Sequence, residues 1–400
     1  MLENTKGKSP FYPGQPVPIE LFAGRKEEIE RIMTRGAAQV VQGKPISIFV
    51  QGEYGIGKSS IAGFTQFRAE KEYGLYGIYA SLGGAKTLQD AAVIVLQAVM
   101  QTGGFHSTRW ETIKNWMAKY IKEQQLFGIK INYEALKADA PTFSTPFGML
   151  GFLGEIQKRL GDTGIKGVFL VLDEINGIAG TENFPHFLKG LVDTNAMPGN
   201  SVPLLLMLCG VEERRREMIQ RHQPIDRIFD VIDIKTMDNQ EMTDFFQRAF
   251  DSARMKINAD ALQILRYYSA GFPKIMHIIG DAAYWLDQDG VIDKEDARKA
   301  VIIAADEVGK KYVEQQIYKA LRSERYHSIL EKIAKIPDRM SFTKSEVSDD
   351  LNESEKKIFH NFLQRMKGLH VIRAGEERGE YIFNMRMVQL YIWLSFVRKS

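Results

Sequence analysis

The pattern of apolar and polar positions divides the chain into three parts. In the first part, four apolar runs of strand length are separated by helical segments; the runs are 46–51, 75–81, 167–172 and 202–209. The last two runs are almost entirely apolar, which is typical of strands that are covered on both faces. Strands that alternate with helices in this order predict an α/β fold with a doubly wound parallel sheet and right-handed crossovers.

The second and third parts have different patterns. Residues 238–323 predict helices without strands, at 239–254, 259–270, 273–286 and 293–321, and we interpret them as a helical lid. The last part predicts a short helix (327–336), two further helices (343–351 and 354–369) and two short strands joined by a turn at 375–379. A helix, a helix–turn–helix and a β-hairpin in that order predict a winged helix.

These patterns predict four segments along the chain. Prolines at positions 10, 13, 16 and 18 favour an extended N-terminal arm over residues 1–20. The α/β core is expected over residues 21–237, the lid over 238–323 and the winged helix over 324–400. An aromatic-rich helix is also predicted at 110–120, within the core.

Composition and charge exclude several classes of protein. The 53 basic and 50 acidic residues leave a net charge of +3, too small for a protein that coats nucleic acid. The single cysteine, Cys209, cannot form a disulfide within the chain. The first ten residues lack the apolar stretch of a signal peptide, and the most membrane-like run, 390–397, is far shorter than the roughly 20 residues that span a bilayer. We therefore expect a cytoplasmic protein with no membrane segment.

A glycine-rich loop between a predicted strand and a predicted helix carries the strongest chemical signal. It fits the pattern G-x-x-x-x-G-K-[ST] at every fixed position; its residues are Gly52, Glu53, Tyr54, Gly55, Ile56, Gly57, Lys58 and Ser59, followed by Ser60. Backbone N–H groups in such a loop surround phosphate oxygens, and the helix N-terminus adds its positive dipole end. Lys58 is expected to reach the β and γ phosphates of ATP, and Ser59 to bind Mg²⁺.

An acid pair ends the apolar run at 167–172. Asp173 is expected to hold Mg²⁺ through water, and Glu174 to polarise the water that attacks the γ phosphate. The alternative is that the two acids merely end a strand and cap the following turn. Together with the glycine-rich loop, the pair favours ATP hydrolysis.

Several segments together resemble AAA+ ATPases of the origin-recognition type and their STAND and transposition-regulator relatives. These segments are Phe22-Ala-Gly-Arg25, the Gly52–Ser59 loop, the strand that ends at Asp173-Glu174, Gly271-Phe-Pro-Lys274 and the terminal winged helix. The resemblance implies that Phe22 and Arg25 lie against the adenine and that Lys274 senses the γ phosphate. It also implies that an arginine reaches the γ phosphate of a neighbouring subunit.

Two positions within this resemblance leave alternatives open. Arg227 is the first candidate for the arginine that acts in trans, and Arg214–Arg216 is the reserve, although that run also fits a solvated helix face. Cys209 stands where the family usually has a polar residue, and it fits a core position better. This departure, and a lysine rather than an arginine at position 274, indicate slow hydrolysis. The arginine that acts in trans implies a homo-oligomer whose assembly stimulates hydrolysis.

The C-terminal segment gives a mixed signal for DNA. Residues 325–400 contain 14 basic and 10 acidic residues, a charge of +4 that leaves −1 for the rest of the chain. The helix at 354–369 carries DNA-contact candidates at Lys356, Lys357, Asn361, Gln364 and Arg365, whereas the predicted wing contains three acids. The family resemblance implies an ATP switch that acts on DNA in replication, transposition or mobile-element maintenance. The alternatives are a protein-binding or defence-signalling ATPase, and a protein that binds ATP without turnover.

Overall fold

The computed structural model describes most of the chain in two compact units. The described residues are 6–15, 17–101, 144–197, 199, 201–319, 321, 323–334, 341–369, 371–375 and 377–397. One unit comprises residues 16–235, and the other comprises residues 1–15 together with 236–400. The helix predicted at 110–120 lies outside the described residues.

The first unit, residues 16–235, contains a five-stranded sheet in the order β2-β3-β4-β1-β5, in which every pair of neighbours is parallel. The strands are β1 (Ile46–Gln51), β2 (Leu75–Ser81), β3 (Gly167–Asp173), β4 (Leu204–Gly210) and β5 (Asp230–Asp233). All residues of β3 and β4 are buried, which confirms that both faces of these strands are covered. The predicted α/β sheet is therefore confirmed, and β5 is an additional edge strand that the sequence pattern did not reveal.

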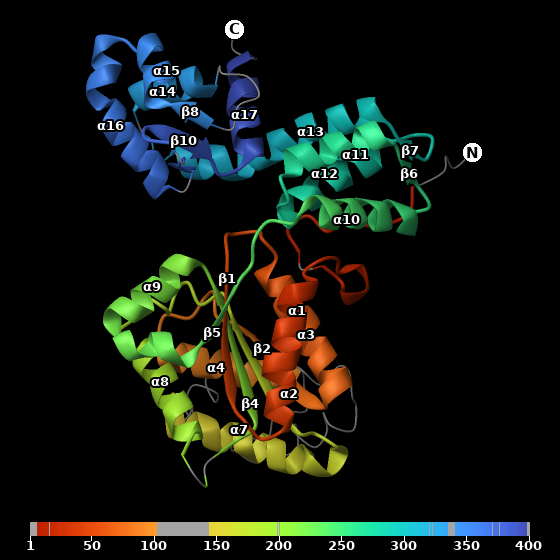
Figure 1. Cartoon of the computed structure of the whole chain (residues 1–400), viewed down its shortest axis with the longest axis vertical. Helices are drawn as coiled ribbons and strands as arrows, with labels where there is room; N and C mark the ends of the chain where they lie inside the picture. The colour runs from red at the N-terminus through yellow and green to blue at the C-terminus, as the bar shows by residue number, and fades with distance from the viewer. Residues whose placement is uncertain are drawn as a thin grey trace, which may run out of the picture. The chain divides into compact units, whose positions relative to one another are not determined.

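Helices cover both faces of this sheet. One side carries α1 (Lys26–Ile32), η2 (Met33–Ala37), α2 (Ala38–Val41) and α3 (Lys58–Tyr73), and the other carries α4 (Leu88–Gln101), α7 (Pro146–Leu160) and α8 (Asn183–Asn195) (Figure 1). The remaining elements are η1 (Ile19–Leu21), η4 (Gly161–Thr163), α9 (Glu212–Arg221) and η5 (Gln223–Ile228). The connection after β1 leads to one edge of the sheet and the connection after β4 leads to the other. In doubly wound sheets, ligands bind at the carboxyl ends of two such strands.

In the second unit, the segment from residue 236 onward starts with four helices: α10 (Asn239–Ser252), α11 (Ala259–Ser269), α12 (Pro273–Leu286) and α13 (Lys294–Val308). Helix α13 continues into η6 (Gly309–Tyr318). The prediction that this region has no strands is wrong. Strands β6 (Lys256–Ile257) and β7 (Val291–Ile292) pair in parallel. Strands of two residues are too short to show a hydrophobic period, so the sequence pattern could not indicate them.

The second unit continues with α14 (Glu324–Ala334), β8 (Ser341–Thr343), α15 (Lys344–Asp350), α16 (Glu353–Gly368), β9 (Ile372–Ala374), β10 (Glu380–Phe383) and α17 (Arg386–Val397). The three strands form an antiparallel sheet in the order β8-β10-β9. Capping boxes begin both α15, at Thr343, and α16, at Asn352. The apolar run at 390–397 lies within α17. Among the described residues, no helix combines the length and apolarity that a membrane span requires.

The N-terminal arm packs on α12 within the second unit. Phe11 is buried among Phe245, Phe250 and His277. Gly280 makes this packing possible, because a Cβ there would lie 2.2 Å from the Phe11 ring. The backbone N–H of Tyr12 donates to Nδ1 of His277 at 3.1 Å, and burial lowers the pKa of His277 to about 4, which keeps the ring neutral.

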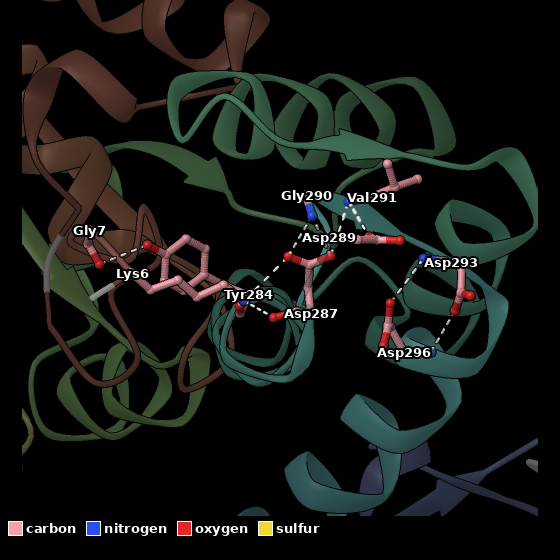
Figure 2. A network of polar contacts seen from close by, with 9 residues as sticks. All are labelled: Lys6, Gly7, Tyr284, Asp287, Asp289, Gly290, Val291, Asp293 and Asp296. Atoms are coloured by element: carbon pink, nitrogen blue, oxygen red, sulfur yellow. Dashed lines mark hydrogen bonds and ion pairs between the residues drawn. The ribbon is translucent and has the colours of Figure 1, made fainter. Parts of the chain in front are cut away.

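Polar contacts fix the same arm at the C-terminal end of α12 (Figure 2). The Lys6 ammonium donates to the backbone carbonyls of Tyr284 and Asp287 and pairs with the buried Asp287 carboxylate at 3.3 Å. The Tyr284 hydroxyl donates to the carbonyl of Gly7 at 2.7 Å. A cation that caps free carbonyls at a helix C-terminus is favourable for both the hydrogen bonds and the helix dipole. The arm is therefore an integral part of this unit.

Candidate functional site

The Gly52–Ser59 loop connects β1 to α3 at the carboxyl edge of the sheet. Gly57 precedes α3 with a φ of 102°, a conformation that favours glycine. Gly52 is required for a different reason, because a Cβ there would lie 2.7 Å from the carbonyl oxygen of Ile234. The predicted strand, loop and helix are therefore present, and the N-terminus of α3 opens directly from the loop.

Lys58 turns back toward its own loop. Its ammonium donates to the carbonyl oxygens of Gly52 at 2.9 Å and Glu53 at 2.8 Å, and it lies 5.5 Å from the centre of the exposed Tyr54 ring. Burial lowers the pKa of Lys58, whereas the electrostatic influence of Cys209 and then of Asp173 raises it. Phosphate oxygens would offer this ammonium stronger, charge-assisted hydrogen bonds than the two carbonyls do.

The acid pair lies at the end of β3, close enough to Lys58 for both carboxylates to influence its pKa. Asp173 is almost fully buried, and its Oδ1 accepts a hydrogen bond from the backbone N–H of Glu174 at 2.8 Å. Glu174 has a left-handed backbone with a φ of 54°, and its Oε2 accepts a hydrogen bond from the Ser81 hydroxyl at 3.1 Å. Gly83 leaves room for this carboxylate, since a Cβ there would lie 2.5 Å from Oε2.

Two further residues of the site, Tyr79 and Ser81 on β2, were missed by sequence reasoning. The Tyr79 hydroxyl donates to Oδ2 of Asp173 at 2.5 Å. In the register of the sheet, Ser81 pairs with Asp173. Alternate residues of a strand share a face, so Tyr79 and Ser81 lie on one face of β2. Each of them donates a hydrogen bond to one of the two acids. The sequence contains no signal for this register.

Phe22 and Arg25 contact the same loop and its helix. The Phe22 ring stacks on Phe64 of α3 with centroids 4.5 Å apart. Arg25 is buried, has a left-handed φ of 64°, and donates from Nη2 to the carbonyl oxygen of Ile56 at 3.2 Å. The structure therefore brings both residues to the glycine-rich loop, and their contact with adenine stays a prediction.

The candidate arginines differ in their partners. Arg214 pairs with Glu217 at 2.7 Å, Arg215 with Asp226 at 2.5 Å, and Arg216 with Glu212 at 2.7 Å. Arg215 also donates to Oε1 of Gln51, at the end of β1, at 2.9 Å. Arg227, on η5, is exposed and forms no hydrogen bond or ion pair with the described part of the chain. Of these arginines, Arg227 is the one that is exposed and has no ion-pair partner among the described residues.

The remaining predicted residues occupy different environments. Cys209 is fully buried in β4, as predicted for a core residue, and burial raises the pKa of its thiol well above the usual value. Lys274 is exposed in the first turn of α12, in the other unit. Gly271, just before α12, has a φ of 75°, and a Cβ there would lie 2.3 Å from the carbonyl oxygen of Met237. This glycine is therefore required by the fold.

The donor set at the loop fits magnesium bound together with a nucleotide. Within the described residues, no cluster of three or more histidine, cysteine or acidic side chains is suited to holding a metal. Mg²⁺ does not need such a cluster, because it binds one or two protein oxygens together with phosphates and water. The Ser59 hydroxyl, in the first turn of α3, and the Asp173 carboxylate, at the end of β3, provide those oxygens.

The sheet order and the glycine-rich loop define the α/β fold of P-loop AAA+ proteins. No protein-family model and no curated protein sequence matches the chain. Among solved structures, it is similar to a Walker-type ATPase of Pyrococcus abyssi, with 16% identity, coverage of 93% of this chain and 96% of that one, and a TM-score of 0.57. It is also similar to the ORC2 protein of Aeropyrum pernix in ADPNP–ADP complexes, with 11% identity, coverage of 97% and 95%, and a TM-score of 0.59. At these identities the similarity concerns the fold.

Proposed function

We propose that the chain is an ATP-binding and ATP-hydrolysing molecular switch. The observation that carries this proposal is the joint placement of Lys58 in the glycine-rich loop and of Asp173 and Glu174 at the neighbouring strand end. In this assignment the loop N–H groups and Lys58 bind the phosphates, and Ser59 and Asp173 hold Mg²⁺. When bound, the ion neutralises charge on the phosphate oxygens. Glu174 orients the attacking water, and the buried Cys209 offers only a weak hydrogen bond, so turnover is slow.

Removing the Lys58 ammonium tests nucleotide binding. Lys58→Ala deletes one or two charge-assisted hydrogen bonds, each of which contributes about 1.5–3 kcal/mol. ATP affinity is therefore expected to fall at least about 10- to 100-fold. The measurement is a titration of a fluorescent ATP analogue with Mg²⁺, and Lys44→Ala, at the opposite end of β1, is the control. Equal affinities for wild type and Lys58→Ala would remove the loop from the nucleotide site.

The proposed switch assembles into homo-oligomers and uses Arg227 in trans. Support comes from Arg227 being exposed on η5 and unpaired within the described chain, while Arg214, Arg215 and Arg216 each form an ion pair. An arginine supplied by a neighbour would stabilise the charge that develops on the transferred phosphoryl group. It would also make hydrolysis depend on assembly.

We further propose that residues 324–400 form a winged helix that binds DNA through α16. Support comes from the order of α14, α15, α16 and the β9–β10 hairpin, and from the two faces of α16. Its buried face consists of Glu355, Phe359, Phe362, Leu363 and Met366. Its exposed side chains include Lys356, Lys357, His360, Asn361, Gln364 and Arg365. Cations and amides on one helix face suit phosphates and base edges.

Removing two of these charges tests the DNA proposal. The variant Lys357→Ala with Arg365→Ala is expected to reduce the slope of log affinity against log salt by about 2, since each phosphate contact contributes about 0.9. DNA binding is measured at several salt concentrations with ATP analogue and Mg²⁺. Lys299→Ala with Lys310→Ala removes the same charge from α13 and η6, and it should leave the slope unchanged. Wild type that fails to bind DNA tightly at low salt would favour a protein partner instead.

A further inference from the structure

Tyr79 occupies a distinctive position within the candidate metal site. It lies on β2, two residues before Ser81, and its ring is half-buried. Its hydroxyl donates to Oδ2 of Asp173, one of the two protein groups assigned to Mg²⁺, at 2.5 Å. The phenol and the carboxylate come from neighbouring strands, β2 and β3, so this hydrogen bond holds the carboxylate from the adjacent strand.

The direction of this hydrogen bond follows from the chemistry of the partners. A phenol carries an O–H donor and a carboxylate accepts hydrogen bonds, so the Tyr79 proton is directed to Oδ2 of Asp173. The phenol is therefore a fixed donor to one oxygen of the carboxylate that is assigned to Mg²⁺.

Two hydrogen bonds fix the Asp173 carboxylate. Its Oδ1 accepts from the Glu174 N–H at 2.8 Å and its Oδ2 accepts from Tyr79, so both oxygens have a partner in the protein. Each carboxylate oxygen has two lone pairs, which leaves an acceptor position on each for a water bound to the metal. Without the phenol, Oδ2 of Asp173 would lose its partner in the protein, and the carboxylate would be held through Oδ1 alone.

We propose that Tyr79 is a positioning residue that orients Asp173 for Mg²⁺ before the ion binds, and thereby lowers the Mg²⁺ concentration that the site needs. This inference rests on the proposed nucleotide function. Partners that orient metal ligands without touching the metal change metal affinity by about 10- to 100-fold. Tyr79→Phe keeps the ring and removes only the hydroxyl, so a loss of metal affinity in that range is expected.

The test measures metal affinity apart from turnover. Mn²⁺ is titrated by electron paramagnetic resonance into protein saturated with ADP, and ADP affinity is measured in parallel with EDTA. Tyr79→Phe should bind Mn²⁺ about 10- to 100-fold more weakly than wild type while keeping ADP affinity in EDTA, which also shows that the variant is folded. Tyr76→Phe, the same change on the same strand at the position that pairs with Val168, should match wild type.

Two results would overturn the inference, and they are distinct. Unchanged or tighter Mn²⁺ binding by Tyr79→Phe, with ADP affinity intact, would remove the positioning role and leave the proposed function standing. Failure of wild type to bind ADP would remove both.

Discussion

Glu174→Gln is expected to lower the rate of phosphate release by about 10²- to 10⁴-fold while ATP still binds. The carboxylate lies near Lys58 and is held by Ser81, so it is placed to accept a hydrogen bond from water beside the γ phosphate. An amide of the same shape cannot take up a proton. Binding depends on the loop and on Lys58, neither of which changes in this variant.

Phosphate release under single-turnover conditions, together with a nucleotide titration, separates these two effects. Glu182→Gln is the matched control, because Glu182 is exposed and directly precedes α8, outside both the glycine-rich loop and the acid pair. It should release phosphate at the wild-type rate. Equal release by wild type, Glu174→Gln and Lys58→Ala would remove the catalytic assignment.

Arg227→Ala is expected to reduce turnover by about 10³- to 10⁵-fold at protein concentrations where wild type is assembled, the range that an arginine supplied to a phosphoryl group contributes. Arg227 forms no ion pair within the described chain, so its loss should leave the subunit's own stability almost unchanged. The wild-type rate per subunit should rise with protein concentration, and that of the variant should stay low.

Arg216→Ala provides the comparison for this prediction. Arg216 is also exposed, but it pairs with Glu212 on the same helix at 2.7 Å. A surface pair of this kind contributes little, so the control should keep the wild-type rate. An unchanged turnover rate in Arg227→Ala would show that Arg227 does not act in trans. A loss of turnover confined to Arg216→Ala would assign that role to Arg216 on α9 instead.

Much of the sheet could be predicted because its signals are local. The predicted runs at 46–51 and 75–81 coincide with β1 and β2, since a buried parallel strand needs a continuous apolar run. The glycine-rich loop could also be predicted from the sequence, because the spacing of its residues and its position between a strand and a helix are both local features. Strands β6 and β7 were missed because two residues carry no period.

The rest of the site depends on contacts between distant segments. Tyr79 and Ser81 meet the acid pair only because β2 and β3 pair in a particular register. The N-terminal arm was predicted as extended from its prolines, but its packing depends on Phe11 meeting Gly280, far along the chain. A single sequence contains no record of either juxtaposition.

The structure of the chain with a non-hydrolysable ATP analogue and Mg²⁺ tests the central claim most directly. We predict that the phosphates lie within the Gly52–Ser59 loop, that the Lys58 ammonium moves from the carbonyls of Gly52 and Glu53 to phosphate oxygens, and that the metal is held by Ser59 and Asp173. An analogue bound elsewhere, with Lys58 still donating to those two carbonyls, would contradict the account.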